Sequence, residues 1–441
     1  MLTKKNDSRI DRRQFLKYSA LSATSFVVGC AVNPVTGKMQ LMLVSKEQEI
    51  QIDRQHSPHQ YSADYGFIQD KGIASYVNQV GQNMVKNTHR TDMPYAFHCV
   101  NATYVNAYAF PGGSIAATRG ILLSLENEAE LAALMGHELG HVNARHTAEQ
   151  LTSSKVTSAI VSGAAMLAQT QDKTYGALVS GLGALGSGLL LSKYSRDNER
   201  EADALGLSYM VKTNYGPNGF IGLMDMLRNM SSHKPNAIEV MFASHPMSDE
   251  RYATAQKSVN EKYASKKDLP IYRERYMDNM ASLRAIETTI QKVQDAELHI
   301  AKKRFDDAEQ DLKMALRKAP SDYAALMVMS KCQLAQKNFN EAKRFAQRAN
   351  QVYPSEPQSN HILGMTNIHL KRFDSAYHNF EQYEKLLPGN PNTLFYKGFS
   401  LENAGKKEHA AQAYVSFLKQ VKQGDQAKHA YNCLAQWGYT K

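Results

Sequence analysis

Residues 127–141 of this 441-residue chain run NEAELAALMGHELGH. An asparagine followed three residues later by glutamate is typical of a helix N-terminus, where the side chains satisfy free backbone N–H groups. In the helix that follows, His137 and His141 are one turn apart on one face, so both imidazoles can bind one tetrahedral ion. Glu138 lies beside them, where it can act as general base toward a water molecule. The stretch indicates the active-site helix of a zinc peptidase, although two purely structural histidines would fit the same spacing.

A second segment can supply the ligand that this helix lacks. A catalytic zinc site usually has three protein ligands and one open position. In residues 195–203 (SRDNEREAD), Glu199 and Asp203 are four residues apart and share a helical face. Glu199 can provide a carboxylate ligand, and Asp203 can accept the free N–H of a ligating histidine. Glu201 is expected to face solvent. A surface helix held by salt bridges is the alternative.

A strand, a turn and a second strand are predicted before the active-site helix. Residues 106–115 run NAYAFPGGSI, with a Pro-Gly-Gly turn between two apolar stretches. Asn106, Ala107 and Tyr108 are candidate substrate-binding residues, because an exposed strand edge can pair with an extended peptide backbone. An ordinary hairpin explains the pattern equally well.

The last part of the chain repeats with a period of 34 residues. Three positions recur in register: Ala308, Ala342, Ala376 and Ala410; Leu312, Ala346, Phe380 and Tyr414; Pro320, Pro354 and Pro388. A small residue where two helices touch, a packing position and a helix-ending proline form the tetratricopeptide (TPR) pattern. Stacked helix pairs of this kind form a concave surface that binds peptides or proteins. The sequence therefore predicts a protein-binding arm, without specifying its partner.

Residues 1–29 are predicted to be an export signal. Arg12-Arg13 resembles a twin-arginine motif, and a modestly apolar stretch follows it. The sequence Val27-Val28-Gly29-Cys30 resembles a lipoprotein signal box, which implies cleavage before Cys30 and acylation of its thiol. Ala31 after the cysteine favours the outer membrane. We therefore expect a lipid-anchored protein in the periplasm; an ordinary signal peptide with a chance cysteine is the alternative.

Charge and cysteine usage argue against other classes of protein. The formal net charge is +10, with about +4 in residues 1–29 and about +7 in residues 284–441. Because these charges form no single basic patch, we expect no nucleic-acid partner. Cys99, Cys332 and Cys433 form no CxxC pair, so we expect small buried side chains and no cysteine-based metal site.

Three motifs together resemble those of the gluzincin peptidases of the HtpX and CAAX prenyl-protease type. They are FPGG at residues 110–113, HELGH at 137–141 and EREAD at 199–203. The sequence NPVTG at residues 33–37 is similar to the opening of bacterial lipoprotein members of this family. With the added repeats, the resemblance implies an envelope endopeptidase that degrades misfolded or stalled outer-membrane proteins and aids their assembly.

The same resemblance implies roles for individual residues. It implies one zinc ion per subunit, held by His137, His141 and Glu199, with Glu138 as general base. It also implies that His245, which Pro246 holds extended, lies over the metal. There His245 would either stabilise the oxyanion or occupy the fourth ligand position in a latent enzyme.

These features predict an α+β, mainly helical protein, with a zincin-type metallopeptidase domain followed by an α-solenoid of TPR repeats. The predicted divisions are a signal peptide (1–29), a linker (30–44), the peptidase (45–275) and the repeats (276–441). The apolar region 156–191 is expected to form a lid over the cleft, with contact to a membrane surface as the alternative. A chaperone or assembly adaptor that works through the repeats, with a latent zinc site, is the alternative function.

Overall fold

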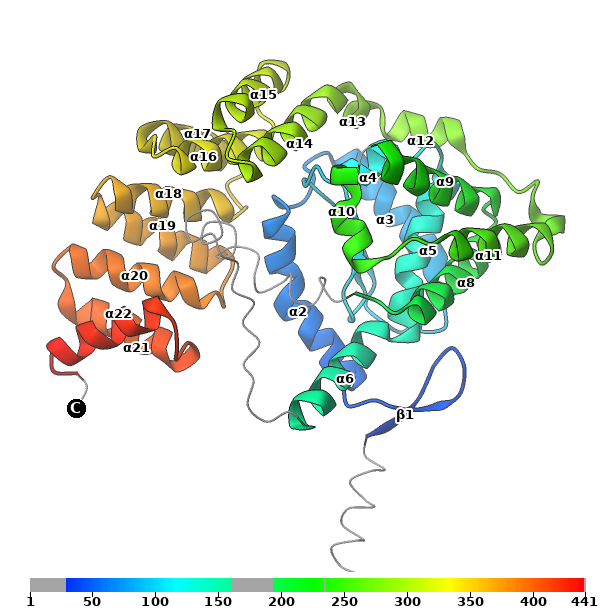
Figure 1. Cartoon of the computed structure of the whole chain (residues 1–441), viewed down its shortest axis with the longest axis horizontal. Coiled ribbons are helices and arrows are strands. Elements are labelled where there is room, and N and C mark those ends of the chain that lie inside the picture. Colours follow the sequence, from blue (N-terminus) through cyan, green and yellow to red (C-terminus); the bar gives the residue numbers. More distant parts are fainter. Residues whose placement is uncertain (1–28, 161–192, 234, 440–441) are drawn as a thin grey trace, which may run out of the picture.

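The computed structural model of the chain describes residues 29–160, 193–233 and 235–439 (Figure 1). The predicted signal peptide up to residue 28, and the predicted lid from residue 161 onward, lie outside the described residues. Within the described part of the chain, no helix is both long and apolar enough to cross a membrane.

Helices dominate the fold, which confirms the predicted mainly helical α+β class. The strands are β1 (Cys30–Val32), β2 (Met39–Leu41), β3 (Ala96–Val100), β4 (Ala107–Ala109) and β5 (Ser114–Thr118). The helices before the repeats are α2 (Lys46–Ala63), α3 (Lys71–Val85), α4 (Arg119–Ser124), α5 (Glu128–Ala144), α6 (His146–Ile160), α8 (Arg196–Lys212), α9 (Asn218–His233), α10 (Pro235–Ser244), α11 (Asp249–Asn260), η1 (Ala264–Lys266), α12 (Arg273–Asn279) and α13 (Ala281–Ala285). The remaining helices are α14 (Glu287–Ala301), α15 (Phe305–Lys318), α16 (Tyr323–Ala335), α17 (Phe339–Val352), α18 (Gln358–His369), α19 (Phe373–Leu386), α20 (Pro391–Asn403), α21 (Lys407–Gln420) and α22 (Asp425–Gln436).

The strands form two small sheets. Strands β1 and β2 make an antiparallel hairpin, and the second sheet has the order β3-β5-β4. The predicted hairpin is confirmed, because β4 pairs antiparallel with β5 and Ala109 lies opposite Ile115. Gly113 closes the turn with a φ of 107°, a conformation that residues with a side chain rarely adopt. Strand β4 is therefore an edge strand of the second sheet.

Helix α5 is the centre of the first part of the molecule, and all of its residues are buried. The predicted N-terminus is confirmed, because the side chain of Asn127 accepts a hydrogen bond from Glu130 N. Helix α8 packs directly on α5, where a Cβ on Gly140 would stand 2.8 Å from Ala202 Cα. The absence of a side chain at Gly140 thus lets the two helices approach at backbone contact. This approach brings the acidic face of α8 over the histidines of α5.

The largest hydrophobic core combines side chains from α3, the second sheet, α5, α8 and α9. It continues into Tyr276, Met280, Leu283 and Ile290, which pack into the same cluster. These four residues follow the predicted domain boundary at residue 275. The boundary itself stays a prediction.

The second half of the chain is a row of stacked helix pairs, drawn from yellow-green to red in Figure 1. Helices α15, α17, α19 and α21 each have 14 residues, and each starts 34 residues after the one before. The turn within each pair holds one residue of positive φ, and these residues are also 34 apart: Lys303, Lys337, Lys371 and Gly405. The predicted TPR arm is confirmed.

Complementary residue sizes hold these pairs together. Gly364 of α18 lies under the ring of Phe380, and Gly398 of α20 lies under the ring of Tyr414. A Cβ on Gly364 would stand 2.6 Å from Phe380, and one on Gly398 would stand 2.7 Å from Tyr414. The glycines therefore provide the space that the large rings fill.

The arm packs against the first part of the molecule through buried polar contacts. Arg119 Nη1 at the start of α4 lies 2.6 Å from Asp322 Oδ2, which caps α16, and both side chains are 4% exposed. Ser62 Oγ at the end of α2 donates to Glu356 Oε1 at 2.5 Å. Gln358 Nε2 donates to the carbonyl oxygen of Ser62. Separating the arm from the first part of the molecule would leave the buried charges of Arg119 and Asp322 without partners.

Candidate active site

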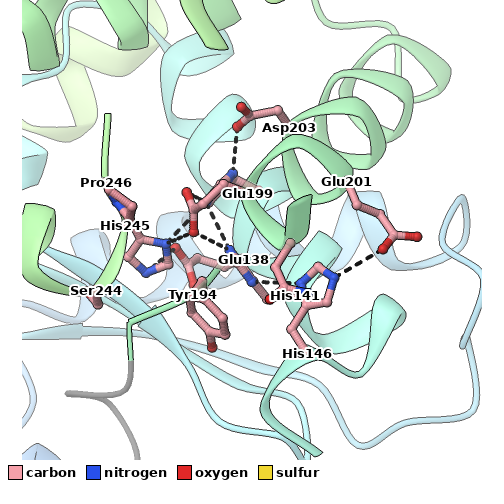
Figure 2. A network of polar contacts seen from close by, with 12 residues as sticks. Glu138, His141, His146, Tyr194, Glu199, Glu201, Asp203, Ser244, His245 and Pro246 are labelled. Carbon is pink, nitrogen blue, oxygen red and sulfur yellow. Dashed lines mark hydrogen bonds and ion pairs between the residues drawn. The ribbon is translucent and has the colours of Figure 1, made fainter. Parts of the chain in front are cut away.

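Four side chains that can bind a metal meet between α5, α8 and the segment after α10 (Figure 2). His137 Nε2 lies 3.1 Å from His141 Nε2 and 3.3 Å from His245 Nδ1. Glu199 Oε1 lies 3.5 Å from His141 Nε2 and 3.0 Å from His245 Nδ1. All four ligand atoms lie within 4.8 Å of one another, and all four residues are buried. Three imidazole nitrogens and one carboxylate oxygen form a donor set that suits a zinc ion.

Two of these side chains, His141 and Glu199, have protonation states that fit metal binding. Burial lowers the pKa of His141 well below its usual value, so its imidazole is neutral, as a metal ligand must be. Burial alone would raise the pKa of Glu199, but His245 and His141 outweigh it and lower that pKa. The site therefore presents a neutral histidine and an ionised carboxylate to a cation.

Glu138 lies beside the four candidate ligands with an unsatisfied oxygen. Its side chain is 1% exposed, and its Oε1 has no hydrogen-bond partner among the described residues. The Nε2 atom of His245 lies 3.9 Å from this oxygen. Burial raises the pKa of Glu138 above its usual value. A buried carboxylate oxygen without a hydrogen-bond partner, next to a set of metal ligands, fits a site that binds a polar molecule such as water.

Asp203 and Arg251 support the candidate ligands from behind. Asp203 Oδ1 lies 3.0 Å from His137 Nδ1, which leaves Nε2 of that ring free to face the cluster. Arg251 donates to both carboxylate oxygens of Asp203 at 2.7 Å, and its Nη1 lies 2.6 Å from Glu199 Oε2. Sequence reasoning missed Arg251, because one arginine 48 residues after Asp203 forms no recognisable spacing. Its capped position in α11 is visible only in the folded chain.

His146 forms a second support, on the other side of the cluster. Its Nδ1 lies 3.0 Å from His141 Nδ1, and its Nε2 lies 3.2 Å from Glu201 Oε2 (Figure 2). The side chain of Glu201 is only 30% exposed, so the expectation that it faces solvent is wrong. The reason is a chain reversal, since Arg145 has a φ of 64° and ends α5. His146 therefore starts α6 and turns its ring back toward His141.

Tyr194 covers one face of the cluster and was also missed. Its ring stacks on His141 with centroids 3.9 Å apart, and its hydroxyl lies 3.0 Å from Thr147 Oγ1. Its backbone N–H donates to the carbonyl oxygen of Ser244 at 3.1 Å, which ties the start of α8 to the His245 segment. A small apolar cavity adjoins the other side of His137 and His245, with room for about one water molecule.

The candidate substrate strand β4 packs beside α5 but is covered. Asn106, Ala107 and Tyr108 are 6%, 0% and 3% exposed, and the Tyr108 hydroxyl donates to Asp64 Oδ2 at 2.6 Å. Hydrogen bonds at Asn106 and Phe110 fix the pairing with β5. By the alternation of an antiparallel pair, the backbone groups of Ala107 and residue 109 then point to the free edge.

Comparison with known proteins identifies the same two parts of the chain. The model of peptidase family M48 matches residues 73–259, and a tetratricopeptide repeat model matches residues 299–363. The metalloprotease YcaL of Escherichia coli is 30% identical over 43% of this chain and 68% of its own length. The putative beta-barrel assembly-enhancing protease of Vibrio cholerae is 27% identical over 60% of this chain and 59% of its own length. The corresponding E. coli protease is 26% identical, over 44% and 40%. The chain thus spans about half the length of these assembly-enhancing proteases.

Proposed function

Because this chain belongs to peptidase family M48, we propose that it is a zinc-dependent endopeptidase of the bacterial cell envelope. The convergence of His137, His141, Glu199 and His245 beside the unpartnered Glu138 oxygen carries this proposal. The names of the relatives support a role in β-barrel assembly. We therefore propose misfolded or stalled outer-membrane proteins as the substrates, with the repeats holding either the substrate or its assembly machinery.

In this proposal His137, His141 and Glu199 hold one zinc ion. When bound, zinc supplies a Lewis acid that polarises the scissile carbonyl group. Asp203 keeps His137 in the tautomer that presents Nε2, and Arg251 holds Asp203 and Glu199 in place. The supporting residues therefore act through the ligands, without touching the substrate.

Glu138 moves the protons of the reaction. Its free Oε1 accepts a proton from the attacking water and then delivers that proton to the nitrogen of the leaving amine. Burial supports this role, because it raises the pKa of Glu138 toward neutral pH. A carboxyl group with such a pKa can both accept and donate a proton.

The position of His245 supports a latent resting state. Its Nδ1 lies 3.3 Å from His137 Nε2 and 3.0 Å from Glu199 Oε1, whereas His141 Nε2 lies 3.1 Å and 3.5 Å from the same two atoms. We propose that His245 fills the fourth ligand position in the described conformation and leaves it when substrate enters. Extended substrate would then pair with the outward-facing backbone groups at Ala107 and residue 109 on strand β4.

The decisive test is the Glu138→Gln variant. It should keep its zinc by elemental analysis but lose cleavage of an unfolded outer-membrane protein by a hundredfold or more. Glu149→Gln, an exposed change on α6, is the matched control and should cleave normally. Cleavage at the normal rate by Glu138→Gln would refute the proposed mechanism.

An assembly adaptor is the second candidate function, and the large TPR arm favours it. The two functions separate in cells that lack the protein. If envelope integrity is restored by the wild type but not by Glu138→Gln, proteolysis is the required activity. If Glu138→Gln restores it fully, the adaptor function suffices.

We propose that Cys30 is acylated and anchors the protein to a membrane facing the periplasm, with the outer membrane as the expected one. The hairpin that starts at Cys30 supports this, because it exposes Val32, Met39 and Leu41 at 56%, 64% and 49%. Apolar side chains next to an acylated residue would rest on the bilayer surface. Incorporation of labelled fatty acid by the wild type but not by Cys30→Ala is the expected result.

A further inference from the structure

A second cluster of metal-ligating side chains lies at the far end of the arm, between α20 and α22. His429 Nε2 lies 2.8 Å from Glu402 Oε2, and Cys433 Sγ lies 3.3 Å from Glu402 Oε1. Cys433 Sγ and His429 Nε2 are 3.5 Å apart. One ligand atom from each residue thus lies within 4.8 Å of the other two. Since His429 and Cys433 are four residues apart on α22, both point to the side where Glu402 lies.

The spacing of these atoms matches the needs of a tetrahedral ion. Zinc binds sulfur at about 2.3 Å and imidazole nitrogen at about 2.0–2.1 Å, which places the two ligand atoms about 3.5 Å apart. The sulfur–nitrogen distance already has this value, and the sulfur–oxygen distance is close to it. The sulfur contact is with Oε1 of Glu402 and the 2.8 Å imidazole contact is with Oε2, so metal binding requires the imidazole and Oε2 to move apart by about half an ångström. We propose that Glu402, His429 and Cys433 form a second metal site, which binds Zn²⁺, contrary to the expectation from cysteine spacing that no cysteine binds a metal.

The surroundings allow an ion to enter and hold the ligands in position. The side chains of His429 and Glu402 are 38% and 24% exposed, so solvent reaches the cluster. Tyr414 donates to Glu402 Oε2 at 2.5 Å and fixes the carboxylate. The ring of His429 packs among Phe395, Phe399 and Tyr414, each 5.8 Å away between centroids. Zinc binding would release the thiol proton of Cys433 to solvent and leave the fourth position to water.

The role of such a site follows from where it lies. Helix α22 is the last described helix, and no further helix in the described part of the chain packs behind it. Among the described residues, α20 and α21 are the helices that α22 packs against. An ion shared by α20 and α22 would clamp this terminal helix to the repeat before it, so that binding energy becomes folding energy of the arm.

The chemistry of the ligands separates this site from the active site. The cluster of His137, His141, Glu199 and His245 contains no sulfur, whereas Cys433 would be a thiolate ligand. Cobalt bound to a thiolate absorbs in the near ultraviolet by charge transfer, but cobalt bound only to nitrogen and oxygen does not. Trp437 provides a second reporter, because it is the chain's single tryptophan and lies 6.2 Å from Tyr414 between ring centroids.

The experiment is a titration of the metal-free full-length protein with Co²⁺ and, separately, with Zn²⁺. We expect two ions per chain, a thiolate charge-transfer band, and a change in Trp437 fluorescence. Cys433→Ser should bind one ion, lose the band and keep normal peptide cleavage. Cys332→Ser, a change at another buried cysteine of the arm, should behave as wild type.

Other variants keep the test independent of how Cys433→Ser folds. His429→Ala should also lose the charge-transfer band, and Zn²⁺ should raise the melting temperature of the arm in wild type but not in either variant. A wild-type protein that binds one ion without the band overturns the proposal. So does a band of equal strength in Cys433→Ser, which would place the thiolate at another cysteine.

Discussion

Gly140 of α5 lies in backbone contact with α8, and a Cβ there would stand 2.8 Å from Ala202 Cα. This contact fixes the distance between the histidine helix and the glutamate helix. Gly140→Ala should therefore push the two helices apart, lower the free energy of unfolding by about 1–3 kcal/mol and weaken metal binding. Thermal melting and elemental analysis measure the two effects. Ala204→Ser on the exposed side of α8 should change neither, and normal metal content in Gly140→Ala would contradict this explanation.

Asp203 should control metal affinity without being a ligand. Asp203→Asn weakens the acceptor for His137 Nδ1 and the pairing with Arg251, so the ring is no longer held in one tautomer. We expect zinc affinity to fall about 10–100-fold in competition with a chelator. Asp197→Asn is the control, because that side chain lies on the same helix and is 86% exposed. Equal affinities of the two variants would count against a supporting role for Asp203.

His245 should act as a brake on proteolysis. If its Nδ1 occupies the fourth ligand position at rest, His245→Ala should cleave an unfolded protein several-fold faster and still hold zinc through three ligands. Initial rates at equal zinc content provide the measurement. His378→Ala, a change at a 71% exposed histidine of the arm, is the control. A slower reaction with full zinc content would instead indicate that His245 stabilises the oxyanion.

The contact between the arm and the peptidase should weaken as pH rises. Burial raises the pKa of Glu356 to about 7 in the folded protein, whereas in the unfolded chain this glutamate has its ordinary, lower pKa. Between pH 4.5 and 7 the folded protein keeps a proton that the unfolded chain has lost, so the free energy of unfolding falls as pH rises through this range. The free energy of unfolding should fall by about 3 kcal/mol at most by pH 8.

The matched variant for this effect is Glu356→Gln, which cannot ionise. Its melting temperature relative to wild type should increase from pH 5 to pH 8. Glu341→Gln, at a 49% exposed position of the arm, should follow the wild-type curve. Parallel curves for wild type and Glu356→Gln would show that this carboxyl group does not titrate in that range.

Features encoded by local spacing were predictable from the sequence. The separation of His137 and His141 predicted a shared helical face, and the period of 34 residues predicted the register of every repeat. Tyr194, His146 and Arg251 were not predictable in their places beside the site. A chain reversal at Arg145 aims His146, and the packing of α11 on α8 brings in Arg251. Such positions depend on contacts between distant segments, which no local pattern carries.

The four-residue spacing of His429 and Cys433 is visible in the sequence, but by itself it does not indicate the proposed metal site. Glu402 stands 27 residues before His429, and only the stacking of α20 and α22 brings the three together. The same holds for Glu356, whose buried carboxyl group accepts a hydrogen bond from Ser62 on a helix almost three hundred residues earlier.

Strand β4, buried at its free edge, has a consequence for timing. A protease with a permanently open groove would attack any loose polypeptide in the envelope, including healthy chains on their way to the membrane. In the proposed mechanism, strand β4 must first be uncovered and His245 must first leave the fourth ligand position. Under that proposal, turnover would be limited by the rate of this opening and not by the rate of bond cleavage. Such an enzyme would spare proteins that pass through the envelope quickly and would degrade those that remain there unfolded.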